Sequence, residues 1–400
     1  LANQNYATAT DSNNTAVGYN AGLSVTTGQF NTLIGSFAGD ALTDTDDNTA
    51  VGYAALSTDT LGKFSTALGS GALNEQNFTT ATNAYNTAVG NSAGNRVSTG
   101  VQNTLIGALT GDALTTGGAN VALGHVALTS DTVGSRATAI GYGALYAQNF
   151  STATDNYNTA MGYDAGGAIT TGFYNTLMGG IAGNALTTGN YNVAMGTDTL
   201  GNDTLGSRTT AIGYGALNSQ NFSTATNTYN TAVGFQAGLG ITTGKFNTFL
   251  GGEAGEDFTT GEKNVAIGAY ALDNDTQGSR NVAVGYQALT NQNFSTAHDA
   301  YNVAVGFNAG VSISSGFYNT FVGALSGDSL SDADYNTAYG YQALTSDTLG
   351  SRSVALGYQA LENQNFTTAT DTYNTAVGFN AGESITTGQK NVCLSSRAGD

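Results

Sequence analysis

The chain has 400 residues, including 56 Gly and no Pro or Trp, and its formal net charge is −18 with 10 Lys and Arg against 28 Asp and Glu. Binding to nucleic acid or to an anionic membrane surface depends on cationic side chains, so this charge balance argues against both partners. No apolar run approaches the roughly 18 to 20 residues of a membrane-spanning helix, so no membrane insertion is expected.

One five-residue stretch, Asn-Thr-Ala-Val-Gly at residues 14–18, returns throughout the chain. Its copies are spaced by 17, 17, 17 and then 21 residues, which defines a super-repeat of 72 residues. Self-similarity at a fixed period indicates a repeat architecture. The 22 copies begin at Asn14, Asn31, Asn48, Ser65, Asn86, Asn103, Asn120, Ala137, Asn158, Asn175, Asn192, Thr209, Asn230, Asn247, Asn264, Asn281, Asn302, Asn319, Asn336, Ser353, Asn374 and Asn391.

The repeat also sets the expected domain organisation. Residues 5–10 echo residues 78–82, so residues 1–13 are expected to be the end of a preceding repeat unit. The chain starts within a repeat and stops soon after a repeat start, so we expect it to be a piece of a longer protein. The continuous array spans residues 14–400, with super-repeats 14–85, 86–157, 158–229, 230–301 and 302–373 and a partial one at 374–400.

Alternation within each copy predicts short strands. In the first copy Thr15 and Val17 share one face and Asn14 and Ala16 share the other, and Gly18 ends the strand. A second short strand is predicted over residues 23–27, closed by Gly28. Two strands and two corners in 17 residues describe one coil of a solenoid. We therefore predict an all-β fold, a parallel β-solenoid of about 22 coils, and no helix because Gly recurs too often.

The face that carries Asn14 and Ala16 has two expected roles. Asn side chains at the start of each strand should stack into an amide ladder along the axis. The Ala16 position is Ala in most copies and large and apolar once per super-repeat. Such a face is too apolar to remain in water, so we predict that it packs against another layer or another chain. The large residues expected in such a seam between chains, which would be a trimer seam if the resemblance described below holds, are Leu33, Leu105, Leu177, Phe249 and Phe321.

The fourth copy in each super-repeat carries four extra residues, which include a recurring Gln-Asn-Phe. Insertions in a solenoid map to loops on one face, which is often the binding face. The loops are therefore candidates for binding a receptor, although an aromatic residue in every copy favours packing against a neighbouring protomer or coil. These residues are Gln76, Asn77, Phe78, Gln148, Asn149, Phe150, Gln220, Asn221, Phe222, Gln292, Asn293, Phe294, Gln364, Asn365 and Phe366.

An acid and an Arg stand just before the fourth copy of most super-repeats. Their spacing predicts structural ion pairs, with an anion-binding or glycan-binding Arg as the alternative. In the first super-repeat Phe64 replaces the Arg. The predicted pairs are Asp131 with Arg136, Asp203 with Arg208, Asp275 with Arg280, and Asp347 with Arg352.

The sequence shows no pattern typical of catalysis. His125 and His298 occupy unrelated places in the repeat, and the only cysteine, Cys393, has no histidine at a recognisable spacing. We therefore expect no enzyme activity and no cofactor. The carboxylates at residues 46–47 and at 332 and 334 could hold Ca²⁺ together with backbone carbonyls, but they match no calcium-binding motif.

Tyr301-Asn302-Val303-Ala304-Val305-Gly306 resembles the NSVAIG repeat of YadA-type trimeric autotransporter adhesin heads, and residues 264–268 and 281–285 are equally close. The resemblance implies a left-handed parallel β-roll in which three chains pack about one axis and bind host surfaces. The NTAxGxxAG pattern is also similar to arrays in trimeric tail-fibre proteins of phages and bacteria.

From these features we expect an extracellular homotrimeric fibre at a cell or virion surface. It would bind a cell-surface glycan or protein receptor through contacts repeated along the array. One alternative is a viral tail-fibre shaft that acts as a spacer, with recognition elsewhere. A minor alternative is an ice-binding solenoid, which needs regular threonine columns. The sequence argues against it, because the third coil carries Asp-Thr-Leu-Gly where others carry Thr-Thr-Gly.

Overall fold

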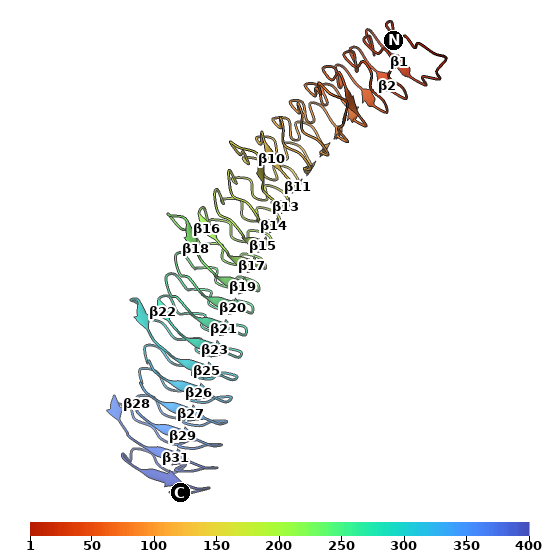
Figure 1. Ribbon diagram of the computed structural model, residues 1–400. Coiled ribbons are helices and arrows are strands. Elements are labelled where there is room, and N and C mark those ends of the chain that lie inside the picture. Colours follow the sequence, from red (N-terminus) through yellow and green to blue (C-terminus); the bar gives the residue numbers. More distant parts are fainter. Residues whose placement is uncertain (400) are drawn as a thin grey trace. The chain divides into compact units, whose positions relative to one another are not determined.

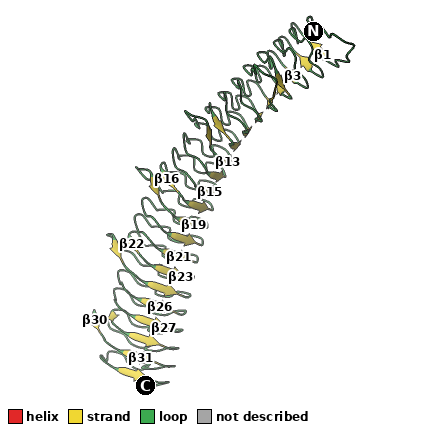
Figure 2. Ribbon diagram, viewed as in Figure 1, coloured by secondary structure: helices red, strands yellow, loops and turns green. Residues whose placement is uncertain are grey.

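The computed structural model describes residues 1–399, and this part of the chain is a parallel β-solenoid of about 22 coils without helix. Figure 1 traces the coils, and Figure 2 shows that each combines a short strand with long turns. The chain divides into two compact units, Leu1–Thr197 and Asp198–Asp400. The predicted all-β solenoid and its coil number are confirmed.

In the first unit, one three-residue strand per coil joins a parallel sheet, and Thr15, for example, lies opposite Thr32 in the next coil. The 17-residue spacing therefore places equivalent residues above one another. The strands are β1 Thr15–Val17, β2 Thr32–Ile34, β3 Thr49–Val51, β5 Thr66–Leu68, β7 Thr87–Val89, β8 Thr104–Ile106, β9 Val121–Leu123, β11 Thr138–Ile140, β13 Thr159–Met161, β14 Thr176–Met178 and β15 Val193–Met195.

The second unit repeats this arrangement, and Val282 lies opposite Val303 across a 21-residue spacing. The insertion therefore does not shift the register. Its strands are β17 Thr210–Ile212, β19 Thr231–Val233, β20 Thr248–Leu250, β21 Val265–Ile267, β23 Val282–Val284, β25 Val303–Val305, β26 Thr320–Val322, β27 Thr337–Tyr339, β29 Val354–Leu356, β31 Thr375–Val377 and β32 Val392–Leu394.

Each insertion is tied to the coil before it by a pair of two-residue parallel strands. The first of these strands ends the third coil of a super-repeat, and the second lies in the inserted loop. The pairs are β4 Gly62–Lys63 with β6 Thr82–Asn83, β10 Gly134–Ser135 with β12 Thr154–Asp155, β16 Gly206–Ser207 with β18 Thr226–Asn227, β22 Gly278–Ser279 with β24 His298–Asp299, and β28 Gly350–Ser351 with β30 Thr370–Asp371.

The second strand predicted over residues 23–27 is wrong. This segment consists of turns and bends, although Ser24 N and Thr26 N still donate hydrogen bonds to the next coil at 3.0 and 3.1 Å. The physical reason is that Asn20 and Gly22 adopt φ values of 56° and 57°, which curl the chain before a strand can extend.

We number coil positions from the residue that begins each repeat copy, which is position 1, so that position 0 is the residue before it. Positions 1 and 3 point into the coil and are fully buried, as Asn48 and Ala50 are. The expected Asn ladder is present: Asn31 Oδ1 accepts a hydrogen bond from Asn48 N at 3.0 Å, and Asn31 Nδ2 donates to Thr45 O at 2.7 Å. These bonds satisfy polar groups that would otherwise be buried without partners.

The residues predicted to form a trimer seam lie instead inside their own chain. All five are fully buried in the single chain, so they offer no surface to a partner and the prediction is wrong for these residues. The interior accepts them because glycines flank them: a methyl group on Gly22 or Gly39 would lie 2.6 or 2.7 Å from the Leu33 side chain. The five are Leu33, Leu105, Leu177, Phe249 and Phe321.

A column of glycines at position 5 closes every strand except β32, where Ser395 takes this place. Gly18 has φ of 136°, and a methyl group there would lie 2.5 Å from Gly35 O in the next coil. Both the backbone conformation and the close approach of successive coils therefore require glycine. This column fixes where the outward-facing positions on either side of it fall.

Candidate functional site

The predicted ion pairs are not formed. Asp131 is fully buried, and Gln148 Nε2 donates to its Oδ2 at 2.6 Å while Gly134 N donates to its Oδ1 at 3.0 Å. Arg136, at the outward position 0, pairs with Asp155 of the inserted loop at 3.2 Å. The acid and the Arg thus point to opposite sides of the backbone. The same separation holds for Asp203 and Arg208, Asp275 and Arg280, and Asp347 and Arg352.

These buried carboxylates serve the fold. Position 12 is apolar in the first two coils of a super-repeat, as at Ile241 and Phe258, but holds Asp275 in the third and Gln292 in the fourth. Burial raises the pKa of Asp275, and hydrogen bonds from Gln292 and backbone N–H groups oppose that rise. The carboxylate accepts the Gly278 and Phe294 N–H groups at 2.9 and 3.3 Å. It therefore anchors the chain where the insertion departs.

The Gln-Asn-Phe loops are braced against their own coil. Gln148 is fully buried, and its Oε1 accepts Asn158 Nδ2 at 2.8 Å, while Phe150 is 5% exposed. The Gln and Phe side chains therefore face the core and not a receptor, which corrects the binding role considered for them. Buried in this way are Gln76, Phe78, Gln148, Phe150, Gln220, Phe222, Gln292, Phe294, Gln364 and Phe366, whereas Asn149, Asn221, Asn293 and Asn365 are exposed and Asn77 is half-buried.

One threonine column continues through the third coil, although the Asp-Thr-Leu-Gly there differs from the Thr-Thr-Gly of other coils. Position 13 keeps a hydroxyl through successive coils, as at Thr115 and Thr132, but Thr115 Oγ1 donates to Thr132 O at 2.9 Å. Position 14 is exposed at Thr99 and Thr116 and then changes to Val133. The regular hydroxyls are thus engaged between coils, and the exposed ones occur in pairs, so no continuous plane of free hydroxyls is formed.

The largest exposed feature is an apolar face. Positions 0, 2, 4 and 6 of each coil alternate along the chain with the buried positions 1 and 3, and we call these four columns the exposed apolar face. Position 4 is Val, Ile, Leu, Met or Tyr in every coil, and Val17 and Leu394 are 59% and 62% exposed. Among residues 1–399, every exposed large apolar side chain belongs to these columns except Leu109 and Tyr146.

Aromatic rings stack along both edges of this face. At position 0, Tyr157 and Tyr174 have centroids 5.3 Å apart with nearly parallel rings, and the Arg136 guanidinium lies 5.5 Å from the Tyr157 centroid. At position 6, Tyr142 and Tyr163 stack at 5.4 Å. Stacked and cation–π contacts of this kind stabilise neighbouring coils. The rings present their edges to solvent and extend the apolar surface on both sides of the strands.

The charge on this face differs from that of the rest of the chain. Six of the ten Lys and Arg residues stand at position 0, and Asp47 is the only acidic residue at positions 0, 2, 4 or 6. The face itself therefore carries little negative charge, although the chain has a net charge of −18, and the acids beside its edge, such as Asp155, pair with the Arg residues at position 0. The six cations are Arg136, Arg208, Lys263, Arg280, Arg352 and Lys390.

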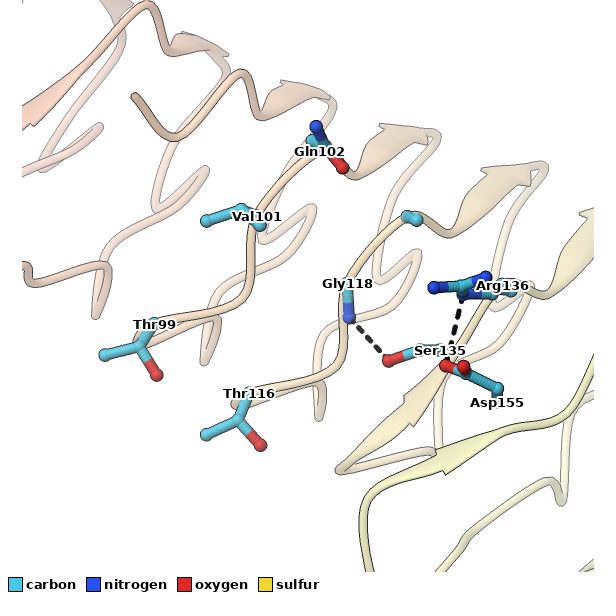
Figure 3. Close-up of a pocket in the computed structure, with 9 residues that line it drawn as sticks. Thr99, Val101, Gln102, Thr116, Gly118, Ser135, Arg136 and Asp155 are labelled. Carbon is cyan, nitrogen blue, oxygen red and sulfur yellow. Dashed lines mark hydrogen bonds and ion pairs between the residues drawn. The ribbon is translucent and has the colours of Figure 1, made fainter. Parts of the chain in front are cut away.

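A hollow of about 240 Å³ lies beside this face in the second super-repeat (Figure 3). It exists because Gly118 and Ala119 stand where the next super-repeat has Asn190 and Tyr191. Its lining is mainly polar: hydroxyls, an amide, a guanidinium and a carboxylate surround the space. The lining residues are Thr99, Val101, Gln102, Thr116, Gly118, Ala119, Ser135, Arg136 and Asp155.

The described part of the chain shows no arrangement of three or more His, Cys, Asp or Glu residues that could hold a metal ion. Carboxylates considered for calcium make bonds within the chain: Asp46 pairs with Lys63 at 2.6 Å, and Asp334 accepts Phe317 N at 2.9 Å. No helix suited to crossing a bilayer occurs in residues 1–399.

Comparisons with models of protein families and with curated proteins found no match to this chain. The function is therefore argued from the surface that the coils build.

Proposed function

We propose that this chain is a structural segment of an extracellular homotrimeric fibre. The observation that supports the proposal is the exposed apolar face, which repeats in every coil. Monomeric soluble proteins rarely expose contiguous apolar patches larger than a few hundred Å². Here aliphatic, Met and Tyr side chains form a column at position 4, and aromatic rings line both edges. A surface of this kind needs a partner that covers it in every coil.

A second copy of the same chain fits this requirement. The face repeats at the spacing of neighbouring strands, about 4.8 Å, and an identical chain presents the same spacing. At its centre, position 4 is apolar in every coil and position 2 is Thr or Val, and Asp47 is the only acidic residue at positions 0 and 6. Apolar burial then supplies the attraction, and the acidic surfaces of the two chains remain in water.

The width of the face favours three chains. From position 0 to position 6 an extended chain spans at most about 20 Å. Three walls of that width enclose a triangular prism whose walls lie about 6 Å from the axis, close to half the roughly 10 Å separation of packed sheets. Four walls would lie about 10 Å from the axis and leave a hole that side chains do not fill.

The test is the mass of the chain in solution. We expect light scattering to give three times the chain mass of 40.4 kDa. The double variant Met161→Glu/Met195→Glu places charges in the position 4 column and should be monomeric, because three copies of each carboxylate would be buried together. Thr171→Glu/Thr188→Glu adds the same charge at exposed position 14, outside the face, and should remain trimeric. A monomeric wild-type chain would refute the proposal.

The hollow favours a second role, the binding of a receptor sugar. The hydrogen-bond donors and acceptors around the hollow could bind the hydroxyl groups of a sugar. They are the Thr99 and Thr116 hydroxyls, the Gln102 amide and the Arg136 guanidinium. Arg136 is held in place by Asp155 at 3.2 Å and by the Tyr157 hydroxyl at 2.7 Å. Three chains would present three such sites, so that weak contacts add up through multivalency.

Binding to an array of cell-surface glycans tests this role. Arg136→Ala should lose glycan binding. Arg280→Ala is the equivalent change in the fourth super-repeat, where Glu262 and Lys263 replace Gly118 and Ala119, and it should retain binding. Equal binding by both variants would place recognition elsewhere. The chain would then be a spacer, as in the shaft of a viral tail fibre.

A further inference from the structure

The two edges of the exposed apolar face are complementary in size in the second coil of each super-repeat. In the second coil of every super-repeat position 6 is small, whereas position 0 is large. The small residues are Ser36, Ala108, Gly180, Gly252, Ala324 and Ser396, and the large ones are Phe30, Gln102, Tyr174, Phe246, Tyr318 and Lys390.

The small residues at position 6 are not required by the chain itself. A methyl group built on Gly180 meets no atom within 4 Å, and Gly180 has no left-handed φ. One coil earlier, the same position holds Tyr163, which is 62% exposed. By contrast, a methyl group on the adjacent Gly179, with φ of 135°, would overlap the carbonyl of Gly196. Gly179 is therefore explained by the fold, and Gly180 is explained only by something outside the chain.

The other coils carry further matched edges. In the fourth coil of every complete super-repeat except the first, position 0 is Arg and position 6 is Tyr, a pair that suits cation–π contact. In most first coils both positions are aromatic, which suits ring packing. The fourth-coil pairs are Arg136 and Tyr142, Arg208 and Tyr214, Arg280 and Tyr286, and Arg352 and Tyr358; the first-coil pairs are Tyr157 and Tyr163, Tyr229 and Phe235, Tyr301 and Phe307, and Tyr373 and Phe379.

From this complementarity we propose that neighbouring chains pack edge to edge in register, with position 0 of one chain against position 6 of the same coil in the next. Tyr174 of one chain then fills the space beside Gly180 of its neighbour. This inference rests on the proposed trimer. In a cyclic assembly every chain repeats the same head-to-tail contact, and a ring closes only if that contact carries no shift along the axis.

Engineered disulfides test the register. The background is Cys393→Ala, since Ala376 holds the same position in the preceding coil. Tyr174→Cys combined with Gly180→Cys should give a covalent trimer on oxidation. Within one chain these residues lie six apart, up to about 20 Å along an extended strand, whereas a disulfide needs Cα atoms within about 7 Å. An intrachain bond would leave a monomer on a denaturing, non-reducing gel, so a covalent trimer reports bonds between chains.

The matched control pairs chains that are shifted by one coil. Tyr157→Cys with Gly180→Cys places the thiols one coil apart and should give no covalent trimer. A crosslink in this control, or none in the Tyr174 and Gly180 pair, would overturn the register. A covalent dimer in place of the trimer would overturn three-fold packing.

A second measurement uses a single substitution at Gly180. Gly180→Trp should leave the fold of the chain unchanged, because nothing lies within 4 Å, and should raise the dissociation constant of the assembly about tenfold or more. Thr171→Trp adds the same ring at an exposed site outside the face and should not change it. If the wild type is trimeric and Gly180→Trp assembles equally well, only the register proposal fails. A monomeric wild type overturns both proposals.

Discussion

Replacing Gln292 by Leu should destabilise the chain through the buried carboxylate of Asp275. Gln292 Nε2 donates to Asp275 Oδ2 at 2.5 Å, and both side chains are fully buried. Leu has the size and polarity found at this position in other coils, such as Leu330, so packing alone predicts a mild effect. The carboxylate, however, loses its shortest hydrogen bond and keeps its charge in a buried site.

The expected loss is about 2 to 4 kcal/mol in the free energy of unfolding at pH 8, since a hydrogen bond to a buried charge is removed and its acceptor remains. The loss should become smaller as the pH falls, because burial already raises the pKa of Asp275 and the variant raises it further, so that protonation increasingly removes the buried charge. Asn302, which donates to Gln292 Oε1, keeps its bond to Gly316 O at 2.7 Å.

Urea denaturation at pH 8 and at lower pH, at one protein concentration, measures the loss. Hydrogen exchange at the Gly278 and Phe294 amides reports the site directly, because both donate to Asp275. The control is Gln277→Leu, at a half-buried position that holds Leu205 and Leu349 in neighbouring super-repeats. An unfolding free energy of the Gln292 variant equal to that of the control at pH 8 would refute the reasoning.

Three further outcomes follow from the same structure. Gly251→Ala should lower the unfolding free energy by about 3 kcal/mol or more, because φ is 142° and the added methyl group would lie 2.6 Å from Gly268 O. Gly252→Ala should change it by no more than about 0.5 kcal/mol, since no atom lies within 4 Å of a methyl group there. Equal melting temperatures of the two variants would contradict this. Asn247→Ala removes a donor to Gly261 O at 2.8 Å and an acceptor for the next Asn of the ladder, and should cost about 2 to 4 kcal/mol in urea denaturation. Burial and neighbouring acids raise the pKa of Asp273 to about 6, so between pH 7.5 and pH 5 the folded chain binds protons that the unfolded chain does not. The melting temperature should therefore rise as the pH is lowered from 7.5 to 5. A fall in the melting temperature, or the same pH dependence in Asp273→Asn, would contradict this.

The regular spacing and the two-residue alternation carried enough information for the fold. Asn14 and Ala16 share one face in the structure as the alternation predicts, and the parallel register follows from equal spacing. Local turns were harder to foresee. The backbone of Asn20 is left-handed although Asn can also extend a strand, and this choice replaced the second predicted strand by turns.

The polar contacts could not be read from proximity in the sequence. Asp131 and Arg136 are five residues apart, and an ion pair is the simplest expectation for them. The intervening turn points one inward and the other outward, so the Asp meets Gln148 from the next coil and the Arg meets Asp155. A signal for this was available, because position 12 reads apolar, apolar, Asp, Gln in every complete super-repeat. That pattern becomes meaningful only when the column is known to be buried.

The position of the apolar surface shows why the trimer seam was assigned to the wrong face. Small residues such as Ala50 indicate close packing, and the closest packing here is between successive coils of one chain, which lie within the distance of neighbouring strands. In the strand itself, the inward positions 1 and 3 take mostly Asn and Ala, with Leu or Phe at position 3 once per super-repeat, and the larger Val, Ile, Leu and Met side chains lie outside at position 4. In a globular domain those sizes would be reversed, with the large apolar residues in the core. A strand that places mostly Ala inward at position 3 and a larger apolar side chain outward at position 4 leaves apolar surface exposed on the single chain. In the proposed trimer the other chains supply the second layer, and the exposed apolar face is where substitutions should separate folding of the coil from assembly.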